Sequence, residues 1–333
     1  MSDPSGLARL ALVYLDRLTR WGASRAELLR EARLHEAQLQ DPDARIPLAA
    51  MVRLWRATSA RLPDPALGLR LGADIRAREL GLVGYTMSFS ATLGEALARI
   101  ARYDRIVSDA LEVHLEPTEG ATWVRIDVQP ALLAFRPAAD ARLAALLGVC
   151  REITSAPIEP LTVQLPYRRP DAAEEYERFF RAPLEFGALG TAFLLSASDL
   201  ARPIAAGDPS LTSYLDQLAR QALAALGAEH TMEDQVRRVL WTDLSAGEAH
   251  LERVARRLGL SPRALQRRLA EEKTTFAAVL ARLRQDTAQP LLRDGRLAVA
   301  EVAYLLGYED PSSFQRAFRR WTGLSPRTFR RRT

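Results

Sequence analysis

The amino-acid sequence predicts an α+β domain, with helices around a small, mainly antiparallel sheet, followed by an all-α domain with two helix-turn-helix motifs joined by a linker helix. Three observations predict this fold class. Apolar residues follow a helical spacing at both ends of the chain and a strand spacing in the middle. A helix–glycine–helix pattern occurs twice near the C-terminus. The charge is also divided, since residues 230–333 hold 20 basic and 12 acidic side chains whereas residues 1–229 hold 26 and 29.

Length and composition exclude several classes of protein. The 333 residues give room for more than one domain at roughly 100–200 residues each. A single cysteine, Cys150, excludes an internal disulfide and a cysteine-rich zinc cluster; its apolar surroundings indicate a buried structural residue, with a redox sensor as the alternative. No apolar run approaches the roughly 20 residues of a membrane helix, and Asp3 stands where an export signal carries positive charge. We therefore expect a cytoplasmic protein without a membrane segment.

The first hundred residues are expected to be helical. Apolar residues at helical spacing predict helices from residue 7 to the Trp21-Gly22 pair, at 24–34, at 47–61 and at 93–108. Thr92 precedes the last of these helices, and Glu95 follows three residues later, which is the pattern of a capping box.

The middle of the chain then changes period. Residues 111–116 and 123–128 alternate between apolar and polar side chains around a turn at Gly120, which predicts a β-hairpin. The elements expected after it are a helix at 137–154, a strand at 161–165, a helix at 171–181 and one or two strands within 184–195. Together these elements predict a small sheet with helices packed on it.

From Pro209 the chain is expected to be helical again. Leu211, Leu215 and Leu218 continue at the same spacing into two alanines, which forms a short seam suited to dimerisation. The alternative is that this stripe packs on its own domain. We accordingly divide the chain into an α+β regulatory domain (1–208), a helical dimerisation or linker segment (209–231) and a basic helical domain (232–333).

The repeated pattern lies in this basic domain. Residues 254–269 read VARRLGLSPRALQRRL, and residues 302–318 read VAYLLGYEDPSSFQRAF. In both copies a glycine ends one helix, and a polar residue, Ser261 or Asp310, is placed to cap the next. This is the helix-turn-helix pattern, expected at about 251–271 and 299–321, whose second helix enters the major groove of DNA. Two copies in register inside the basic third of the chain indicate a DNA-binding domain.

The linker helix between the two motifs is expected from about Thr275 to Arg293. At 1.5 Å per residue it spans roughly 27 Å, which suits two motifs near the ~34 Å repeat of the major groove. Pro290 lies inside this helix and is expected to kink or shorten it, because proline removes a backbone hydrogen bond.

At this point the sequence resembles a known family. Residues 299–308 (VAEVAYLLGY) and 313–327 (SFQRAFRRWTGLSPR) resemble the DNA-binding domain of AraC/XylS transcription regulators. Residues 66–72 (ALGLRLG), 81–85 (GLVGY) and 92–97 (TLGEAL) resemble the arabinose-binding-like effector domain of the ornithine- and virulence-regulator branch of that family. The resemblance implies a sequence-specific transcription regulator with a ligand-responsive N-terminal domain.

The resemblance also assigns candidate DNA contacts. The positions that match the family's base-reading positions are Arg263, Gln266 and Arg267 in the first motif and Ser312, Gln315 and Arg316 in the second. Arginine and glutamine suit bidentate contacts to guanine and adenine, whereas Pro311, also at a matching position, cannot donate a hydrogen bond and predicts looser reading by the second motif. The candidates for phosphate contacts are Ser261, Arg268, Arg319, Arg320, Arg327 and Arg330. The alternative is that these arginines form only a solvated face.

The expected partners are double-stranded DNA at two adjacent major grooves, RNA polymerase, a second copy of the chain and a small effector. Five aromatic residues are candidates for the effector pocket, with core packing as the alternative: Trp55, Tyr85, Phe89, Tyr103 and Trp123. No cofactor and no metal are expected, because the four histidines form no ligand pair and no nucleotide-binding loop occurs.

Three hypotheses about function follow. The first is an activator controlled by an effector bound in the N-terminal domain. The second is an effector-independent repressor or architectural protein whose N-terminal domain only dimerises. The third, an enzyme with an appended DNA-binding domain, has no catalytic constellation to support it.

Overall fold

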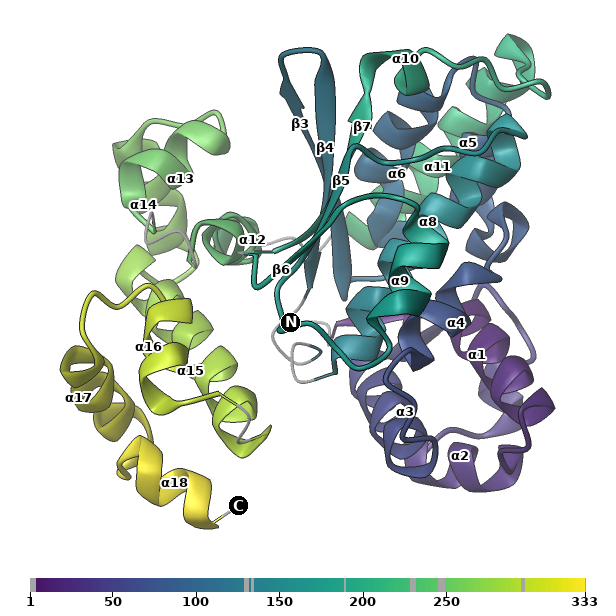
Figure 1. Ribbon diagram of the computed structural model, residues 1–333. Helices are drawn as coiled ribbons and strands as arrows, with labels where there is room; N and C mark the ends of the chain where they lie inside the picture. The colour runs from purple at the N-terminus through teal and green to yellow at the C-terminus, as the bar shows by residue number, and fades with distance from the viewer. Residues whose placement is uncertain are drawn as a thin grey trace. The chain divides into compact units, whose positions relative to one another are not determined.

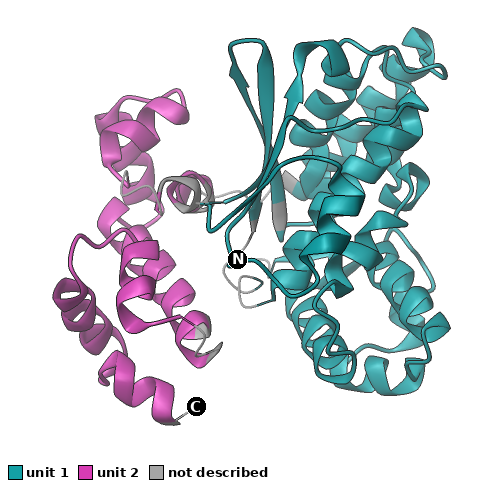
Figure 2. Ribbon diagram, in the orientation of Figure 1, with its two compact units in different colours: residues 1–227 teal, residues 228–333 magenta. Residues whose placement is uncertain are grey.

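The computed structural model describes residues 4–128, 132, 135–188, 190–227, 232–244, 249–294 and 297–332. The chain divides into two compact units, residues 1–227 and 228–333 (Figure 2). The predicted fold class is confirmed, because the first unit combines helices with a small sheet and the described part of the second contains helices and loops alone. The helix that begins at Pro209 belongs to the first unit. Residues 228–231, at the end of the predicted linker segment, lie outside the described residues.

The sheet of the first unit has five strands in the order β3-β4-β7-β5-β6 (Figure 1). These are β3 (Leu111–Thr118), β4 (Ala121–Val128), β5 (Thr162–Leu165), β6 (Leu184–Phe186) and β7 (Thr191–Ser196). All neighbours are antiparallel except β5 and β6, which are parallel and are joined through a helix. The predicted hairpin is β3–β4, with Gly120 in the turn at φ +74°.

Helices form most of the rest of the first unit. They are α1 (Ala8–Arg20), α2 (Arg25–Ala32), α3 (Leu48–Arg61), α4 (Leu67–Ala73), α5 (Leu82–Ser88), α6 (Leu93–Val107), α8 (Arg136–Thr154), α9 (Ala173–Phe180), α10 (Ala197–Leu200) and α11 (Pro209–Gly227), with 3-10 turns at Glu36–Leu39 and Ala77–Leu80. The expected helices agree with these bounds within a few residues. Thr92 caps α6 as predicted, since its hydroxyl accepts from the Glu95 N–H.

Helix α8 is the centre of the core, and α6 and α8 cover the same side of the sheet (Figure 1). Helix α4 lies directly on α8. A Cβ atom at Gly68 or at Gly72 would fall 2.1 Å from a carbonyl oxygen of α8, so only glycine permits this approach. The interpretation of Cys150 as a buried structural residue is confirmed, since it is fully buried in α8 and burial raises the pKa of its thiol to about 12.

The expectation of an all-helical N-terminal third is wrong at two places. Strands β1 (Ser5–Leu7) and β2 (Arg45–Pro47) pair antiparallel into a two-stranded sheet. Asp109 accepts from the Ser5 N–H and pairs with Arg45 at 2.9 Å, which fixes both strands beside the end of α6. Three residues are too few for an alternating pattern to be recognised in a sequence.

The second unit contains seven described helices. They are α12 (Met232–Leu244), α13 (Leu251–Arg257), α14 (Pro262–Glu271), α15 (Phe276–Asp294), α16 (Val299–Leu305), α17 (Pro311–Thr322) and α18 (Pro326–Arg332). The predicted motifs correspond to α13–α14 and α16–α17, and the linker helix is α15. Pro290 was expected to kink or shorten this helix, and the expected shortening is wrong, because α15 continues past that position to Asp294.

Candidate nucleic-acid interface

The first motif presents one polar face of α14. The Ser261 hydroxyl caps the helix by accepting from the Ala264 N–H at 3.2 Å, which leaves it committed to the fold. Leu265 and Leu269 are fully buried and anchor the opposite face. The three predicted base-reading residues are all exposed and follow the i, i+3, i+4 spacing of one helix face: Arg263, Gln266 and Arg267.

The second motif repeats this construction in α17. Asp310 caps the helix, and the hydroxyl and backbone N–H of Ser313 hold the pKa of that carboxyl below its ordinary value. Phe314 and Phe318 are fully buried, as predicted. The matching residues are again exposed at the same i, i+3, i+4 spacing: Ser312, Gln315 and Arg316. Pro311 occupies the first helical position, where the missing N–H removes no intrahelical bond.

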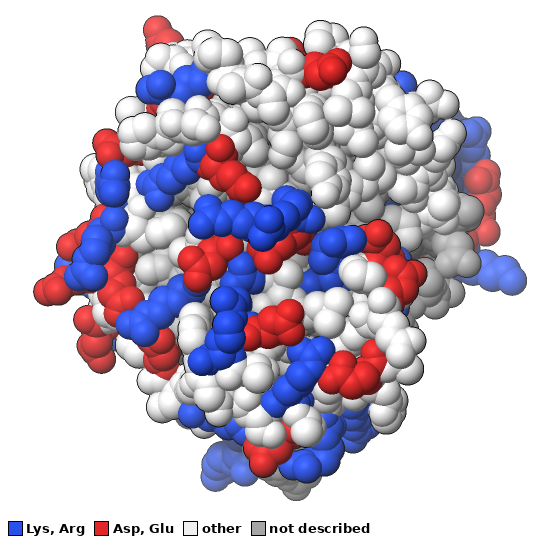
Figure 3. Space-filling model, turned by 90° about the vertical axis from the view of Figure 1, so that its right-hand side faces the viewer, with Lys and Arg blue, Asp and Glu red and all other residues white. Residues whose placement is uncertain are grey.

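The arginines at the predicted base-reading positions have fewer acidic partners than several arginines of the first unit. Within the described part of the chain, Arg263 and Arg316 form no ion pair, and Arg267 has only Glu271 at 3.7 Å in an exposed pair. In the first unit, acidic side chains accompany many of the arginines, as in the pairs Arg25–Glu36 and Arg61–Glu31. On the face shown in Figure 3, blue and red side chains lie next to each other in the same way. The exposed arginines at these positions therefore have few acidic partners: Arg267 lies 3.7 Å from Glu271, and Arg316 donates to the Ser313 hydroxyl at 2.9 Å.

The predicted phosphate contacts fall into two groups. Those with exposed side chains are Arg268, Arg319, Arg320 and Arg327. Arg330 is half-buried, and its guanidinium donates to the Leu297 carbonyl oxygen at 2.6 Å, so that part of its hydrogen-bonding capacity holds α18 to the loop before α16. The arrangement offers two cationic helix faces in one unit, which is the chemistry of a protein that binds a polyanion with regular grooves.

The comparisons with known proteins agree with this geometry. Residues 22–204 match the arabinose-binding domain of AraC transcription regulators, and residues 254–332 match a helix-turn-helix domain. The chain is 31% identical to the ornithine utilization regulator of Pseudomonas aeruginosa over 96% of this chain and 94% of the other. It is 29% identical to the transcriptional regulator VirS of Mycobacterium tuberculosis, with coverage of 95% and 94%.

The chain belongs to the AraC family of transcription regulators. Among solved structures, it is similar to the transcriptional regulator CdpR of Pseudomonas aeruginosa, at 28% identity and a TM-score of 0.44 over 92% of this chain and 96% of the other. These relatives are regulators rather than enzymes. In the described part of this AraC-family chain, no helix is long and apolar enough to cross a membrane.

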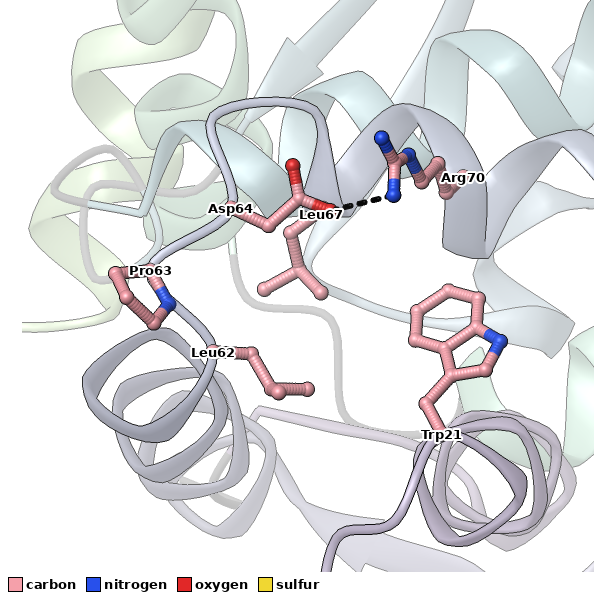
Figure 4. A pocket seen from close by; sticks show the side chains of 6 residues that line it. All are labelled: Trp21, Leu62, Pro63, Asp64, Leu67 and Arg70. Carbon is pink, nitrogen blue, oxygen red and sulfur yellow. Dashed lines mark ion pairs between the residues drawn. The ribbon is translucent and has the colours of Figure 1, made fainter.

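The first unit of this AraC-family regulator contains a cavity of about 380 Å³. Figure 4 shows the Trp21 ring and the side chains of Leu62 and Leu67 around it, with Asp64 and Arg70 joined by an ion pair at one side. Arg70 also forms a two-bond pair with Glu175 at 2.7 and 2.9 Å. The charged groups are thus satisfied by one another, and the remaining wall is apolar.

The structure does not gather the five aromatic residues that were considered for an effector pocket. Trp55 and Tyr103 are buried in the core, and Trp55 lies 5.0 Å from the Tyr14 ring. Tyr85 is 48% exposed, Phe89 is half-buried, and Trp123 lies on β4 beneath Arg125. None of the five is among the residues that line the cavity, and Trp21, which does line it, was not singled out because its position after a helix suggested only a helix end.

The helix α11 carries two apolar stripes. Thr212 and Ala219 are buried against α5 and α6, so one stripe packs on its own domain. The residues of the predicted dimer seam, Leu211, Leu215 and Leu218, lie beside this stripe and are partly exposed. Next to them, Tyr214 is 59% exposed.

Proposed function

We propose that this AraC-family regulator reads DNA through two base-reading faces. They are Arg263, Gln266 and Arg267 on α14 and Ser312, Gln315 and Arg316 on α17. The observation that carries the proposal is the doubled i, i+3, i+4 face: both helices expose three hydrogen-bonding residues on the side opposite their buried anchors. Arginine donates two bonds to guanine O6 and N7, and glutamine pairs with adenine N6 and N7. Two such faces joined by the helix α15 suit sites in two adjacent major grooves.

Phosphate contacts would orient the protein on the duplex. Arg268, Arg319, Arg320 and Arg327 border the reading faces in sequence and are exposed. Such contacts supply affinity without sequence information and make binding depend on salt. For Arg330 and Ser261 we propose only a supporting role, since both already bond within the unit.

The test is selection of duplex DNA from a random pool by the full-length protein at near-physiological salt. Recovery of two short elements about one helical turn, or ~34 Å, apart supports the proposal. Recovery of a single element means that one motif alone reads bases. If no sequence is enriched in the absence or presence of candidate effectors, the proposal of sequence-specific reading is wrong.

We further propose that the protein is an activator controlled by a small effector, acting in the cytoplasm with RNA polymerase as its partner. The cavity lined by Trp21, Leu62 and Leu67 is our candidate for the effector site. Its wall is apolar, and the charged groups beside it, Asp64 and Arg70, form an ion pair with each other. The similarity to an ornithine utilization regulator makes ornithine the first compound to test, followed by other amino acids, fatty acids and aromatic acids. Isothermal titration of the full-length protein measures this binding. If no compound in the panel binds, effector control is contradicted.

A second candidate function is supported by the α11 seam. A homodimer formed through Leu211, Leu215 and Leu218 would place two pairs of motifs on DNA without any effector. In that case the protein acts as a repressor or architectural protein, and its affinity for DNA is independent of metabolites.

A further inference from the structure

The turn of the second motif is held by the linker helix. Arg284, half-buried on α15, donates to the Leu306 carbonyl oxygen at 2.9 Å and to the Gly307 carbonyl oxygen at 3.1 Å. Its guanidinium also lies over the ring of Tyr308, 4.4 Å from the centroid. One side chain therefore contacts three consecutive residues between α16 and α17.

These contacts continue into the reading helix. The Tyr308 ring lies 5.6 Å from that of Phe314, a fully buried residue of α17. Phe314 in turn contacts Phe318 one helical turn further, with 5.6 Å between the ring centroids. A chain of packed side chains thus runs from Arg284 to the buried side of the helix that exposes Gln315 and Arg316.

The helix α12 closes the same turn from another side. A Cβ atom at Gly307 would fall 2.5 Å from the Leu244 carbonyl oxygen at the end of α12. At the corresponding Gly259 of the first motif, no atom lies within 4 Å of such a Cβ. The two turn glycines have nearly the same φ, +67° and +69°, but only at Gly307 would a Cβ atom meet a neighbouring element.

We propose that Arg284 is a positioning residue for base reading by the second motif. This inference rests on the proposed function, because it assumes that α17 reads DNA. The planar guanidinium donates to both carbonyl oxygens of the turn while its face covers Tyr308, and lysine has no such fork. Base contacts require placement within about 0.5 Å. A turn released from α15 would let Ser312, Gln315 and Arg316 move together. Arg284 itself touches no base.

The experiment uses the full-length protein and three variants in parallel selections from one random duplex pool. Arg284→Met keeps an unbranched apolar stem over Tyr308 and removes the donors, and Arg284→Lys keeps the charge and removes the fork. Arg282→Met is the matched control, because Arg282 lies on the same helix and pairs with Glu233 at 2.8 Å, away from the turn. Each protein is then titrated with the duplex recovered by the unchanged chain and with a duplex whose second element is scrambled.

We expect the unchanged chain and Arg282→Met to recover two elements and to prefer the intact duplex by about tenfold or more, since each lost base contact has an effect of this order. Arg284→Met and Arg284→Lys should recover only the first element and bind both duplexes alike. Their affinity for the first element alone should match that of the unchanged chain, which shows that the unit is folded.

Four outcomes contradict the inference. If Arg284→Met recovers both elements at the same spacing, the inference is wrong while the proposed function stands. If Arg284→Met loses affinity for the first element as well, Arg284 supports the whole unit and has no specific role at the second motif. A single element recovered by the unchanged chain means that one motif alone reads bases, so the paired reading that the inference assumes does not occur. No enriched sequence for the unchanged chain refutes the proposed function itself.

Discussion

At the scale of single residues, the partners of an arginine indicate whether it stabilises the fold or is available to bind DNA. Arg17 is buried and donates to the Asp74 carbonyl oxygen and to Glu79, and Arg45 contacts several acceptors beside Asp109. Such side chains are held in place by the fold. Arg263 and Arg267 instead project from α14 with their guanidinium groups in water. An exposed arginine with few partners inside the protein gives up only water when it binds a base or a phosphate. Its binding therefore costs less free energy than that of an arginine that must break an internal ion pair.

The first prediction compares base reading with phosphate binding. Arg267→Ala should weaken binding to the selected duplex by about 1–3 kcal/mol and relax the base preference at one position. Arg331 lies at an exposed position of α18, and we propose it as a further phosphate contact. Arg331→Ala should therefore weaken binding to every sequence alike and lower the salt slope by about one unit. Binding titrations on selected and random duplexes at several salt concentrations measure both. Equal effects of the two variants on both duplexes would contradict the assignment.

The second prediction concerns a carboxyl group buried in the first unit. Asp140 on α8 accepts hydrogen bonds from Tyr167 and Tyr176, yet burial raises its pKa from 3.8 to about 6. Between these values the folded chain holds a proton that the unfolded chain releases. The stabilisation is therefore complete below pH 4 and is lost as pH rises through about 6.

The measurement is the free energy of unfolding in urea from pH 4 to pH 7, with Asp140→Asn as the reference that cannot titrate. The stability of the unchanged chain relative to this variant should fall by roughly 2–3 kcal/mol across the range, because one pKa unit corresponds to about 1.4 kcal/mol. A constant difference between the two proteins would show that the pKa of Asp140 is not raised.

At the scale of elements, the sequence predicts regular periodic segments well and contacts between distant segments poorly. The caps Ser261 and Asp310, the buried anchors of α14 and α17 and the β3–β4 hairpin all follow from local patterns. The strands β1 and β2 do not, since each has three residues and is held by Asp109 at a distance in sequence. Arg284 was missed for the same reason: its acceptors lie 22 and 23 residues further along the chain, and no local pattern marks such a pair.

The candidate effector pocket could not be located from the sequence for the same reason. An aromatic residue in a helix or directly after one has the same sequence signature whether it packs in the core, as Tyr103 does, or borders a cavity, as Trp21 does. The six residues around the cavity come from the end of α1, the segment before α4 and α4 itself. Tertiary packing alone brings these segments together.

The third prediction uses the two turn glycines as a matched pair. Both have positive φ, so alanine at either position costs about 1–2 kcal/mol of backbone strain. Gly307→Ala should cost more than Gly259→Ala, because its Cβ must also displace the Leu244 carbonyl oxygen. Urea unfolding of the full-length variants measures the difference. Equal losses would mean that α12 moves away from the turn at little cost.

The fourth prediction tests the seam of α11. Leu215 lies in the partly exposed stripe, whereas Ala219 is buried against the first unit. Leu215→Glu should therefore convert a dimer into a monomer without unfolding the chain, since it places charge at the proposed interface. Sedimentation equilibrium gives the mass, and thermal unfolding serves as the control for folding. An unchanged dimer would place the interface elsewhere, and a monomeric unchanged chain would refute dimerisation through this seam.

At the scale of the whole molecule, charge and chemistry are divided between the two units. The residues 230–333 carry an excess of eight positive charges, and the rest carry an excess of three negative ones. The second unit thus supplies affinity for DNA, and the first supplies the cavity and the seam. An effector in the first unit changes DNA binding only if it binds the DNA-competent arrangement more tightly than the other arrangement.

The last prediction follows from this thermodynamic linkage. If an effector raises the affinity for the selected duplex by some factor, that duplex must raise the affinity for the effector by the same factor, with about 5–150-fold as the usual range. Titrating the effector in the presence and absence of the duplex, and the duplex in the presence and absence of the effector, measures both sides of the cycle.

Leu62→Trp, which fills the cavity beside Trp21, should abolish effector binding and leave affinity for DNA at its effector-free value. Effector binding that survives this variant would move the site away from the cavity. If no compound changes the affinity for DNA, the effector-independent repressor is favoured. A ligand that binds both arrangements equally well does not shift the equilibrium between them.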